Sequence, residues 1–170
     1  MNQILKGKKG LIFGALDESS IAWKVAEAAV AEGAAITLTN APIAMRMGKI
    51  NELAKKCNAE VVSADATSVD DLNNLLKRCM EIHGGKIDFV LHSIGMSLNV
   101  RKGKHYTEID YGFNSKTLDI SAMSLHRVLA VCMKKDALKE WGSVLALSYI
   151  AAQRVFPDYN EMAEIGRAHV

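Results

Sequence analysis

The sequence lacks the features that mark several large classes of protein. It has only three cysteines, Cys57, Cys79 and Cys132, which stand far apart with no C-x-x-C pair and no histidine at ligand spacing. This arrangement supports neither a disulfide framework nor a zinc site, so we expect buried, reduced thiols and no metal. No stretch approaches the ~20 apolar residues of a membrane span. We therefore expect a cytoplasmic protein that does not enter the membrane.

A strong excess of one charge is also missing. The 21 Lys and Arg residues nearly balance the 19 Asp and Glu residues, for a formal net charge of +2. Neither nucleic acid nor an anionic membrane is therefore expected as the main partner. With two prolines, 49% apolar and 24% charged residues, the composition is that of a folded globular protein. No repeat, linker or low-complexity segment is visible, so we predict a single domain.

What the sequence does contain is an alternation of short β-branched runs and longer segments of helical period. This pattern is typical of β-α units and predicts an α/β fold, a Rossmann-like doubly wound parallel sheet between two layers of helices. The expected strands are 9–14, 35–40, 60–65, 87–95 and 142–149. The expected helices are about 20–33, 42–56 with a break near Gly48, 67–84, and one long helix over about 110–138.

The turn "FGALDESSIAW" stands where a dinucleotide-binding domain has its glycine-rich fingerprint, although only Gly14 is a glycine. Gly14 allows a sharp turn at the strand end, and Ser20 occupies the expected N-cap. The N–H groups of Ile21 and Ala22 would then face outward at a positive helix terminus, which suits a pyrophosphate. The alternative is that Ser20 only caps a helix.

Polar or small residues follow the other strands, at the edge where an open parallel sheet binds its ligand. They are Asn40-Ala41, Asp65-Ala66, Ser93-Ile94-Gly95 and Ser148-Tyr149. Asp65 would bind the adenine amino group or simply stabilise a turn. Gly95 would let the backbone approach the ribose and nicotinamide. Asn40 and Ala41 replace the usual acidic residue, and Arg46 is the nearest cation, so the residues leave NADH or NADPH open.

Three motifs in order, "GALDESSIAW", "LHSIG" and "LALSYIAAQRVFPDYNEM", resemble the enoyl-acyl-carrier-protein reductases of bacterial fatty-acid synthesis, a divergent branch of the short-chain dehydrogenases. The resemblance runs from about residue 5 to about 163 and implies NADH as cofactor, acyl carrier protein as partner and a homotetramer for the full-length protein. A carbonyl-reducing short-chain dehydrogenase would need Tyr-x-x-x-Lys, and Ala163 stands four residues after Tyr159.

The resemblance assigns roles to individual positions. Gly14, Ser20 and Ile21 correspond to pyrophosphate and ribose contacts, Ala41 to the adenosine ribose, Asp65 and Ala66 to adenine, and Ser93, Ile94 and Gly95 to the nicotinamide end. Ser97 would lie beside the acyl thioester, and Tyr149 and Tyr159 match the two active-site tyrosines. A phenol with an ordinary pKa of ~10 stays protonated at neutral pH, so Tyr159 would donate a hydrogen bond to the enolate formed by hydride transfer.

Two further interpretations stay open. The basic residues Arg101, Lys102, Lys104 and His105 would either be a solvated loop or border the docking site of the acidic carrier protein. A different class of function is a nucleotide-binding sensor or scaffold that keeps the fold without the chemistry.

The resemblance ends abruptly near the C-terminus. The family has a lysine seven residues after the second tyrosine, and this sequence has Gly166 there. The last seven residues, "EIGRAHV", are what one frame of a common sequencing adapter would encode. We therefore predict an incomplete dinucleotide-binding domain over 1–163 and a non-native tail over 164–170. Because the family continues with two more strands and a helical lid, we expect the chain as written to be inactive or poorly soluble.

Overall fold

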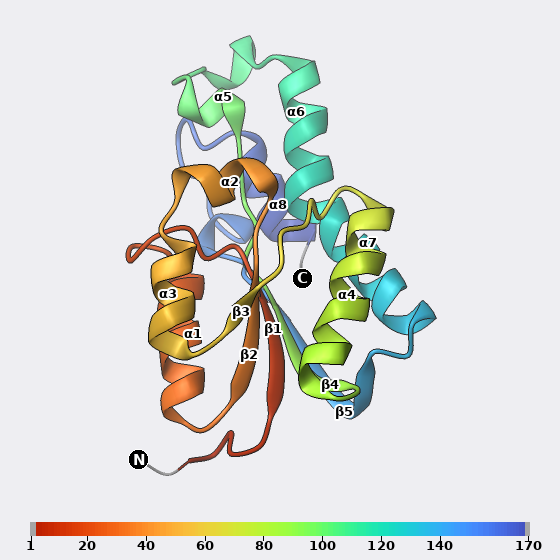
Figure 1. Cartoon of the computed structure of the whole chain (residues 1–170). Coiled ribbons are helices and arrows are strands. Elements are labelled where there is room, and N and C mark those ends of the chain that lie inside the picture. Colours follow the sequence, from red (N-terminus) through yellow and green to blue (C-terminus); the bar gives the residue numbers. More distant parts are fainter. Residues whose placement is uncertain (1–2, 169–170) are drawn as a thin grey trace.

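A parallel five-stranded sheet in the order β3-β2-β1-β4-β5 forms the centre of the molecule, for which a computed structural model describes residues 3–168 (Figure 1). The strands are β1 (Lys9–Phe13), β2 (Ala35–Thr39), β3 (Glu60–Val61), β4 (Ile87–His92) and β5 (Leu138–Ala146). The Rossmann-like α/β prediction is confirmed. The strand order reverses between β1 and β4, which is where such a sheet binds ligands.

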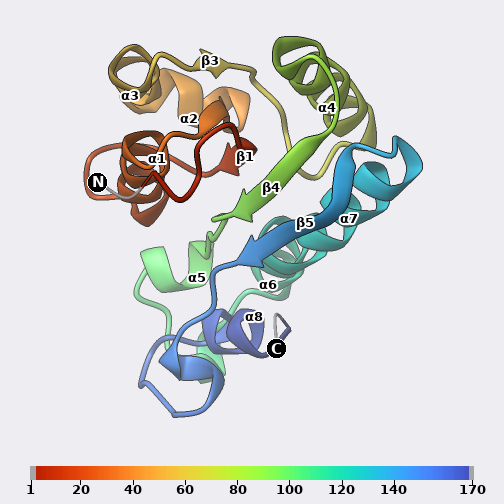
Figure 2. The same cartoon turned by 90° about the horizontal axis from the view of Figure 1, so that it is seen from below.

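Helices cover both faces of this sheet and gather above the carboxyl ends of its strands (Figures 1 and 2). They are α1 (Ile21–Ala31), α2 (Pro42–Met47), α3 (Ile50–Cys57), α4 (Val69–His83), α5 (Leu98–Arg101), α6 (Tyr111–Leu118), α7 (Ser124–Lys134) and α8 (Glu161–Ala168). Single turns of other helix types lie at Tyr106–Glu108, Asp119–Met123 and Ile150–Ala152. None of the described helices is long and apolar enough to cross a membrane.

The hydrophobic core has two halves, one on each face of the sheet. In β1, Leu11 and Phe13 belong to the half covered by α4 and α7, whereas Ile12 belongs to the half covered by α1 and α3. All three side chains are at most 1% exposed. A strand buried on both faces explains why this segment is a continuous apolar run rather than an alternating one.

The three cysteines are buried and free of disulfides, as the sequence predicts. Cys79 lies in α4 and Cys132 in α7, in the same half of the core. Burial raises the pKa of both thiols to about 11, which keeps them protonated at neutral pH. They are therefore packing residues.

Several predicted element bounds are corrected by the structure. The break near Gly48 is confirmed, because α2 and α3 flank an extended Gly48. The long helix over 110–138 is wrong: a π-helical turn over Asp119–Met123 separates α6 from α7. Strand β3 is only two residues long, although Val62 N and Ala64 N still donate to the carbonyls of Leu38 and Asn40 on the β2 side.

Strand β5 begins four residues before its predicted start and ends three before its predicted end. The cause is a bulge: Ile87 pairs with Leu138, but Phe89 pairs with Ser143. Trp141 lies in this bulge with φ of 64° and is 95% exposed. The apolar pattern in the sequence therefore marks only the regular half of the strand. The predicted boundary after residue 163 lies inside α8, and residues 169–170 are outside the described part; the tail stays a prediction.

Gly14 joins β1 to the first turn and needs to be glycine for two reasons. Its φ of 89° lies in the left-handed region, and a Cβ there would be 1.8 Å from the carbonyl oxygen of Ser93. The backbone after β1 therefore touches the backbone after β4 at the point where the strand order reverses.

We predict that Gly14→Ala destabilises the protein more than Gly84→Ala. Gly84 also has a positive φ, 67°, but a Cβ there meets nothing within 4 Å. The matched variant therefore carries only the conformational cost, about 1 kcal/mol, whereas Gly14→Ala adds a backbone clash. Urea unfolding of both variants measures the difference, and equal losses would contradict the role given to the Gly14–Ser93 approach.

Candidate functional site

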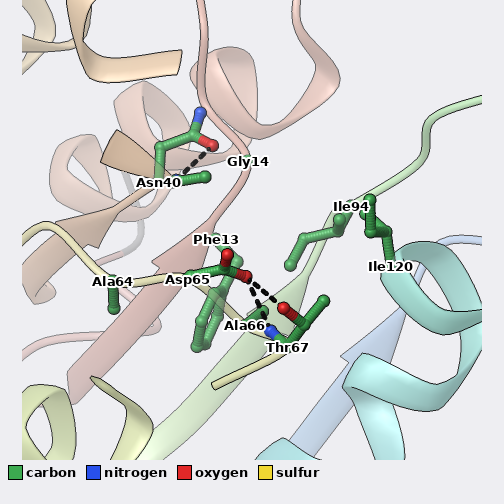
Figure 3. Close-up of a pocket in the computed structure, with 10 residues that line it drawn as sticks. Phe13, Gly14, Asn40, Ala64, Asp65, Ala66, Thr67, Ile94 and Ile120 are labelled. Carbon is green, nitrogen blue, oxygen red and sulfur yellow. Dashed lines mark hydrogen bonds between the residues drawn. The ribbon is translucent and has the colours of Figure 1, made fainter. Parts of the chain in front are cut away.

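A hollow lies at the carboxyl ends of the strands, on either side of the β1/β4 boundary (Figure 3). Its lining comes from the ends of β1, β2 and β4, the segment after β3, and the π-helical turn. The lining residues are Phe13, Gly14, Asn40, Ala41, Ala64, Asp65, Ala66, Thr67, Ile94 and Ile120. Five of the predicted cofactor residues, Gly14, Ala41, Asp65, Ala66 and Ile94, are brought together here.

Ser20 lies at the N-terminus of α1, but its side chain does not cap the helix. Its Oγ instead accepts hydrogen bonds from the backbone N–H groups of Leu16 and Asp17, both at 3.1 Å. The predicted N-cap position of Ser20 is confirmed, but the alternative that its side chain only caps the helix is wrong, because its Oγ holds the turn that precedes the helix. The backbone N–H groups of Ile21 and Ala22 have no partner among the described residues, so the positive end of α1 is free to bind an anion.

On the side of the hollow formed by the ends of β2 and β3, the side chains of Asn40 and Asp65 make hydrogen bonds that fix the surrounding backbone (Figure 3). Asn40 Nδ2 donates to the carbonyl of Ala15 at 3.1 Å, and its Oδ1 accepts from Ala41 N at 2.9 Å. Asp65 Oδ1 accepts from both the backbone N–H and the hydroxyl of Thr67 at 2.8 Å. Asp65 thus stabilises a turn, as one reading of the sequence predicts, and also lines the hollow.

The nicotinamide end of the predicted site follows β4. Ile94 lines the hollow, and Ser93 places its carbonyl against Gly14. Gly95 is exposed, and a Cβ there would meet only Met162 Cε, at 3.6 Å. Protein packing does not require this glycine, because a Cβ would make only an ordinary contact, and its exposure is compatible with the predicted approach of a ligand.

Ser97 differs from the picture given by the resemblance. It is 5% exposed, and its Oγ donates to Glu161 Oε1 at 2.6 Å while accepting from Val100 N at 3.0 Å. Its single proton is therefore engaged inside the protein. Its placement beside a thioester stays a prediction.

The two predicted active-site tyrosines lie against each other. Their ring centroids are 5.3 Å apart in an edge-to-face arrangement with an interplanar angle of 70°. The hydroxyl of Tyr149 is buried and has no hydrogen-bond partner among the described residues. Burial first, and the neighbouring Tyr159 second, raise the pKa of Tyr149 well above its ordinary value. Tyr159 is 38% exposed.

Position 166, where the resemblance implies a lysine, lies beside Tyr149. A Cβ at Gly166 would be 3.3 Å from Tyr149 Cε1 and 3.2 Å from Ala152 Cβ. The carbonyl of Gly166 accepts a hydrogen bond from Ser148 Oγ at 3.0 Å. Helix α8 therefore begins two residues after Tyr159 and passes Tyr149 at Gly166, which has no side chain.

The predicted basic loop is largely exposed, and two of its residues have partners in the structure. Lys102 Nζ lies 4.4 Å from the ring centroid of Phe113, and His105 Nδ1 is 2.9 Å from Asp158 Oδ1. The hydrogen bond with Asp158 raises the pKa of His105. Arg101 and Lys104 have no charged partner among the described side chains.

Sequence reasoning missed several residues of the site. Ile120 reaches the hollow because the π-helical turn interrupts the helix, and a continuous-helix prediction gives no sign of this. Glu161 is only 1% exposed although it follows Tyr159 and Asn160 in a polar run. The sequence around Glu161 contains both polar and apolar residues and gives no sign that this glutamate is buried. Only the folded structure shows that its side chain points inward.

A family model described as enoyl-(acyl carrier protein) reductase matches residues 14–168. The chain belongs to this family. FabI from Alistipes finegoldii, solved as a complex with NADH, is 63% identical with a TM-score of 0.95 and covers 98% of this chain and 59% of that one. Enoyl-[acyl-carrier-protein] reductase from Aquifex aeolicus VF5 is 30% identical with a TM-score of 0.86, over 97% of this chain and 65% of that one.

Curated relatives of the reductase family give the same result at lower identity. Enoyl-[acyl-carrier-protein] reductase [NADH] 2 of Rhizobium meliloti is 32% identical over 164 residues, which is 95% of this chain and 59% of the relative. FabI of Aquifex aeolicus is 33% identical over 163 residues, with 94% and 58% covered. The chain thus spans less than two thirds of the length of these curated relatives.

We predict that Tyr149 is the last tyrosine to ionise in an alkaline titration. Because its folded-state pKa is raised, the unfolded chain loses that proton first, and the stability due to Tyr149 falls as the pH rises above its ordinary value of ~10. Tyrosinate absorbance should show a late step that Tyr149→Phe removes. A late step that survives this substitution would contradict the burial of the Tyr149 hydroxyl.

Proposed function

We propose that this chain carries the cofactor and tyrosine sites of an NADH-dependent enoyl-acyl-carrier-protein reductase of fatty-acid synthesis. The observation that carries the proposal is the Tyr149–Tyr159 pair, in which a buried hydroxyl lacks a protein partner among the described residues. Buried polar groups are paired in the great majority of cases, so an unpaired hydroxyl in a site suggests a ligand atom as the missing partner. The close similarity to a FabI–NADH complex supports this assignment.

The residues present fit a dinucleotide. The free N–H groups of Ile21 and Ala22 would bind the pyrophosphate, with Gly14 and Ser20 shaping the turn before them. Ala41 would face the adenosine ribose, and Asp65 and Ala66 the adenine. Ser93, Ile94 and Gly95 would bound the nicotinamide end. When bound, the reduced nicotinamide supplies a hydride to the β-carbon of the enoyl thioester.

The tyrosines would handle the charge that this reaction creates. Reduction at the β-carbon places negative charge on the thioester oxygen, and a fixed donor at that oxygen lowers the barrier by ~3 kcal/mol. Tyr159 is partly exposed beside Tyr149, and its hydroxyl would be this donor. Burial raises the pKa of Tyr149 further above its ordinary value, so its hydroxyl keeps its proton and would offer a second donor.

NADH is favoured over NADPH by the residues after β2. Both polar atoms of the Asn40 side chain are used by the protein, and Ala41 offers no charge to a 2′-phosphate. Arg46, the cation considered from the sequence, is exposed in α2 and does not line the hollow. The assignment to NADH rests on these residues and on the relatives.

Acyl carrier protein is the proposed partner that delivers the substrate. Arg101 and Lys104 are cations without a charged partner among the described residues, and they belong to the segment that contacts the residues around Tyr159. Complementary charge at this place would speed and orient the encounter with an acidic carrier. The alternative, a binding protein without chemistry, shares the hollow and predicts nucleotide binding alone.

We predict that Asp65→Asn weakens NADH binding roughly tenfold, or about 1.4 kcal/mol. Asparagine keeps an oxygen for the bonds from Thr67 but presents N–H groups where a carboxylate would accept from the adenine. Fluorescence titration with NADH measures the effect. Asp70→Asn, on an exposed residue of α4, is the matched control, and equal affinity of the two variants would exclude Asp65 as an adenine contact.

We also predict that Gly166→Lys raises NADH affinity several-fold, whereas Gly166→Met does not. Both side chains have similar length beside Tyr149, but only lysine adds a charge and donors for the ribose hydroxyls. Adding a crotonyl thioester should then cause loss of nicotinamide absorbance with the lysine variant, and little or none with the unmodified chain. Binding without any oxidation in all three proteins would favour the non-catalytic alternative.

A further inference from the structure

The side chains of the four residues Asp158–Glu161 contact two different parts of the molecule. Asp158, Asn160 and Glu161 all contact one loop, residues 97–105, which precedes them by more than fifty positions. Tyr159 alone is left for the site, where it lies against Tyr149. We call the contacts between 158–161 and 97–105 the clasp.

The outer part of the clasp is at the surface. His105 Nδ1 and Asp158 Oδ1 are 2.9 Å apart, with side chains 69% and 59% exposed. An ion pair this exposed contributes little to stability. Asn160 is 9% exposed, and its Nδ2 donates to the carbonyl of Lys104 at 2.7 Å.

The inner part of the clasp is fully buried and centres on one carboxylate oxygen. Glu161 Oε1 accepts from Ser97 Oγ at 2.6 Å and from Asn99 Nδ2 at 3.2 Å. Thr117 Oγ1, from α6, lies 3.2 Å from the same oxygen. Glu161, Asn99 and Thr117 are at most 1% exposed. One glutamate therefore joins α5, α6 and α8.

The carboxylate has no cation beside it among the described residues, and its Oε2 is buried without a partner there. Removing such a group from water is costly, and the cost is offset by the hydrogen bonds at Oε1 and by the place of Glu161 in the first turn of α8, at the positive end of that helix. An apolar residue would fill the space with less penalty. A glutamate that is costly for packing but joins three elements beside the tyrosines suggests a role in the site.

The backbone on either side of Tyr159 turns sharply. Asp158 and Asn160 have φ of 62° and 42°, in the left-handed region, which Asp and Asn adopt more readily than other side chains. Tyr159 therefore lies between two left-handed residues. The carbonyl of Tyr159 accepts from Met162 N at 3.0 Å, so its placement depends on where α8 begins.

We propose that Glu161 is the positioning residue for Tyr159: by holding the loop 97–105 against the start of α8, it fixes the Tyr159 phenol beside Tyr149. This inference rests on the proposed function, in which Tyr159 is the donor to the enolate. It also gives the Ser97 hydroxyl a different role, because its one proton is donated to Glu161 and is not available to a substrate.

Amide hydrogen exchange of the whole chain without cofactor tests the clasp directly. In Glu161→Ala, exchange should rise roughly tenfold or more at Val100 and Lys104 on one side and at Met162 and Ala163 on the other. Glu161→Gln keeps an oxygen for Ser97 and Asn99 and should remain close to the unmodified protein. Equal exchange in the Gln and Ala variants would overturn the proposal.

Two controls guard against general unfolding. Glu27→Ala removes a glutamate that also has two hydrogen-bond partners, Trp23 and Lys56, but lies in α1 away from the clasp. It should leave all four reporter amides unchanged. If Glu161→Ala does not fold, Ser97→Ala removes the bond to Glu161 from the opposite side, together with the bond that Val100 N donates to Ser97 Oγ within residues 97–105. Faster exchange at Met162 would then support the clasp, and changes confined to the loop would refute it.

The ionisation of Tyr149 reports on Tyr159 itself. If Glu161 positions Tyr159, the late tyrosinate step of Tyr149 should move toward the ordinary tyrosine pKa of ~10 in Glu161→Ala. In Glu161→Gln it should stay late. If the shift came from a loss of packing elsewhere, the Glu161→Gln variant would not restore the late step. Neither measurement needs turnover, so the two failures can be told apart. Failure of the clasp would leave exchange unchanged in Glu161→Ala, whereas failure of the reductase assignment would show as no NADH oxidation by Gly166→Lys.

Discussion

The close approach of Gly14 to the carbonyl of Ser93 is the contact on which the site depends. It brings the end of β1 and the end of β4 together where the strand order reverses, and every predicted cofactor residue lies on a segment that starts from one of the strand ends around it. A side chain at position 14 would push the two segments apart. The first turn then needs no further glycine, because Ser20 supports it with two hydrogen bonds to its hydroxyl oxygen.

Local chemistry explains what the sequence predicts well. The alternation of apolar runs and helical periods gives the parallel sheet, and α4 begins close to its predicted start, where Ser68 caps it by accepting a hydrogen bond from Asp71 N. The polar residues after β1 to β4 converge because parallel strands end at the same edge. The tyrosines, ten positions apart, were recognised from a family motif, and the structure adds that their rings touch.

The errors have a different origin: contacts between distant segments override local preference. Ser20 has the residue type of a cap, but its oxygen accepts from the preceding turn. A helical period over 110–138 does not reveal that Ser121 exchanges hydrogen bonds with Met96 and so fixes a π-helical turn. Nothing near Glu161 in the sequence indicates that Ser97, Asn99 and Thr117 surround it. Such residues are found only when the chain is folded.

The π-helical turn separates two helices that serve different parts of the molecule. Helix α7 packs on α4 and the sheet, whereas α6 contributes Thr117 to the polar cluster under the tyrosines. Each residue added to a helix rotates the next part of that helix by about 100°. The wider π-helical turn therefore changes the rotation of α7 relative to α6. The apolar side chains of α7 face α4 and the sheet, while Thr117 of α6 faces Glu161. The π-helical turn thus lets a single helical segment serve both the sheet and the candidate site.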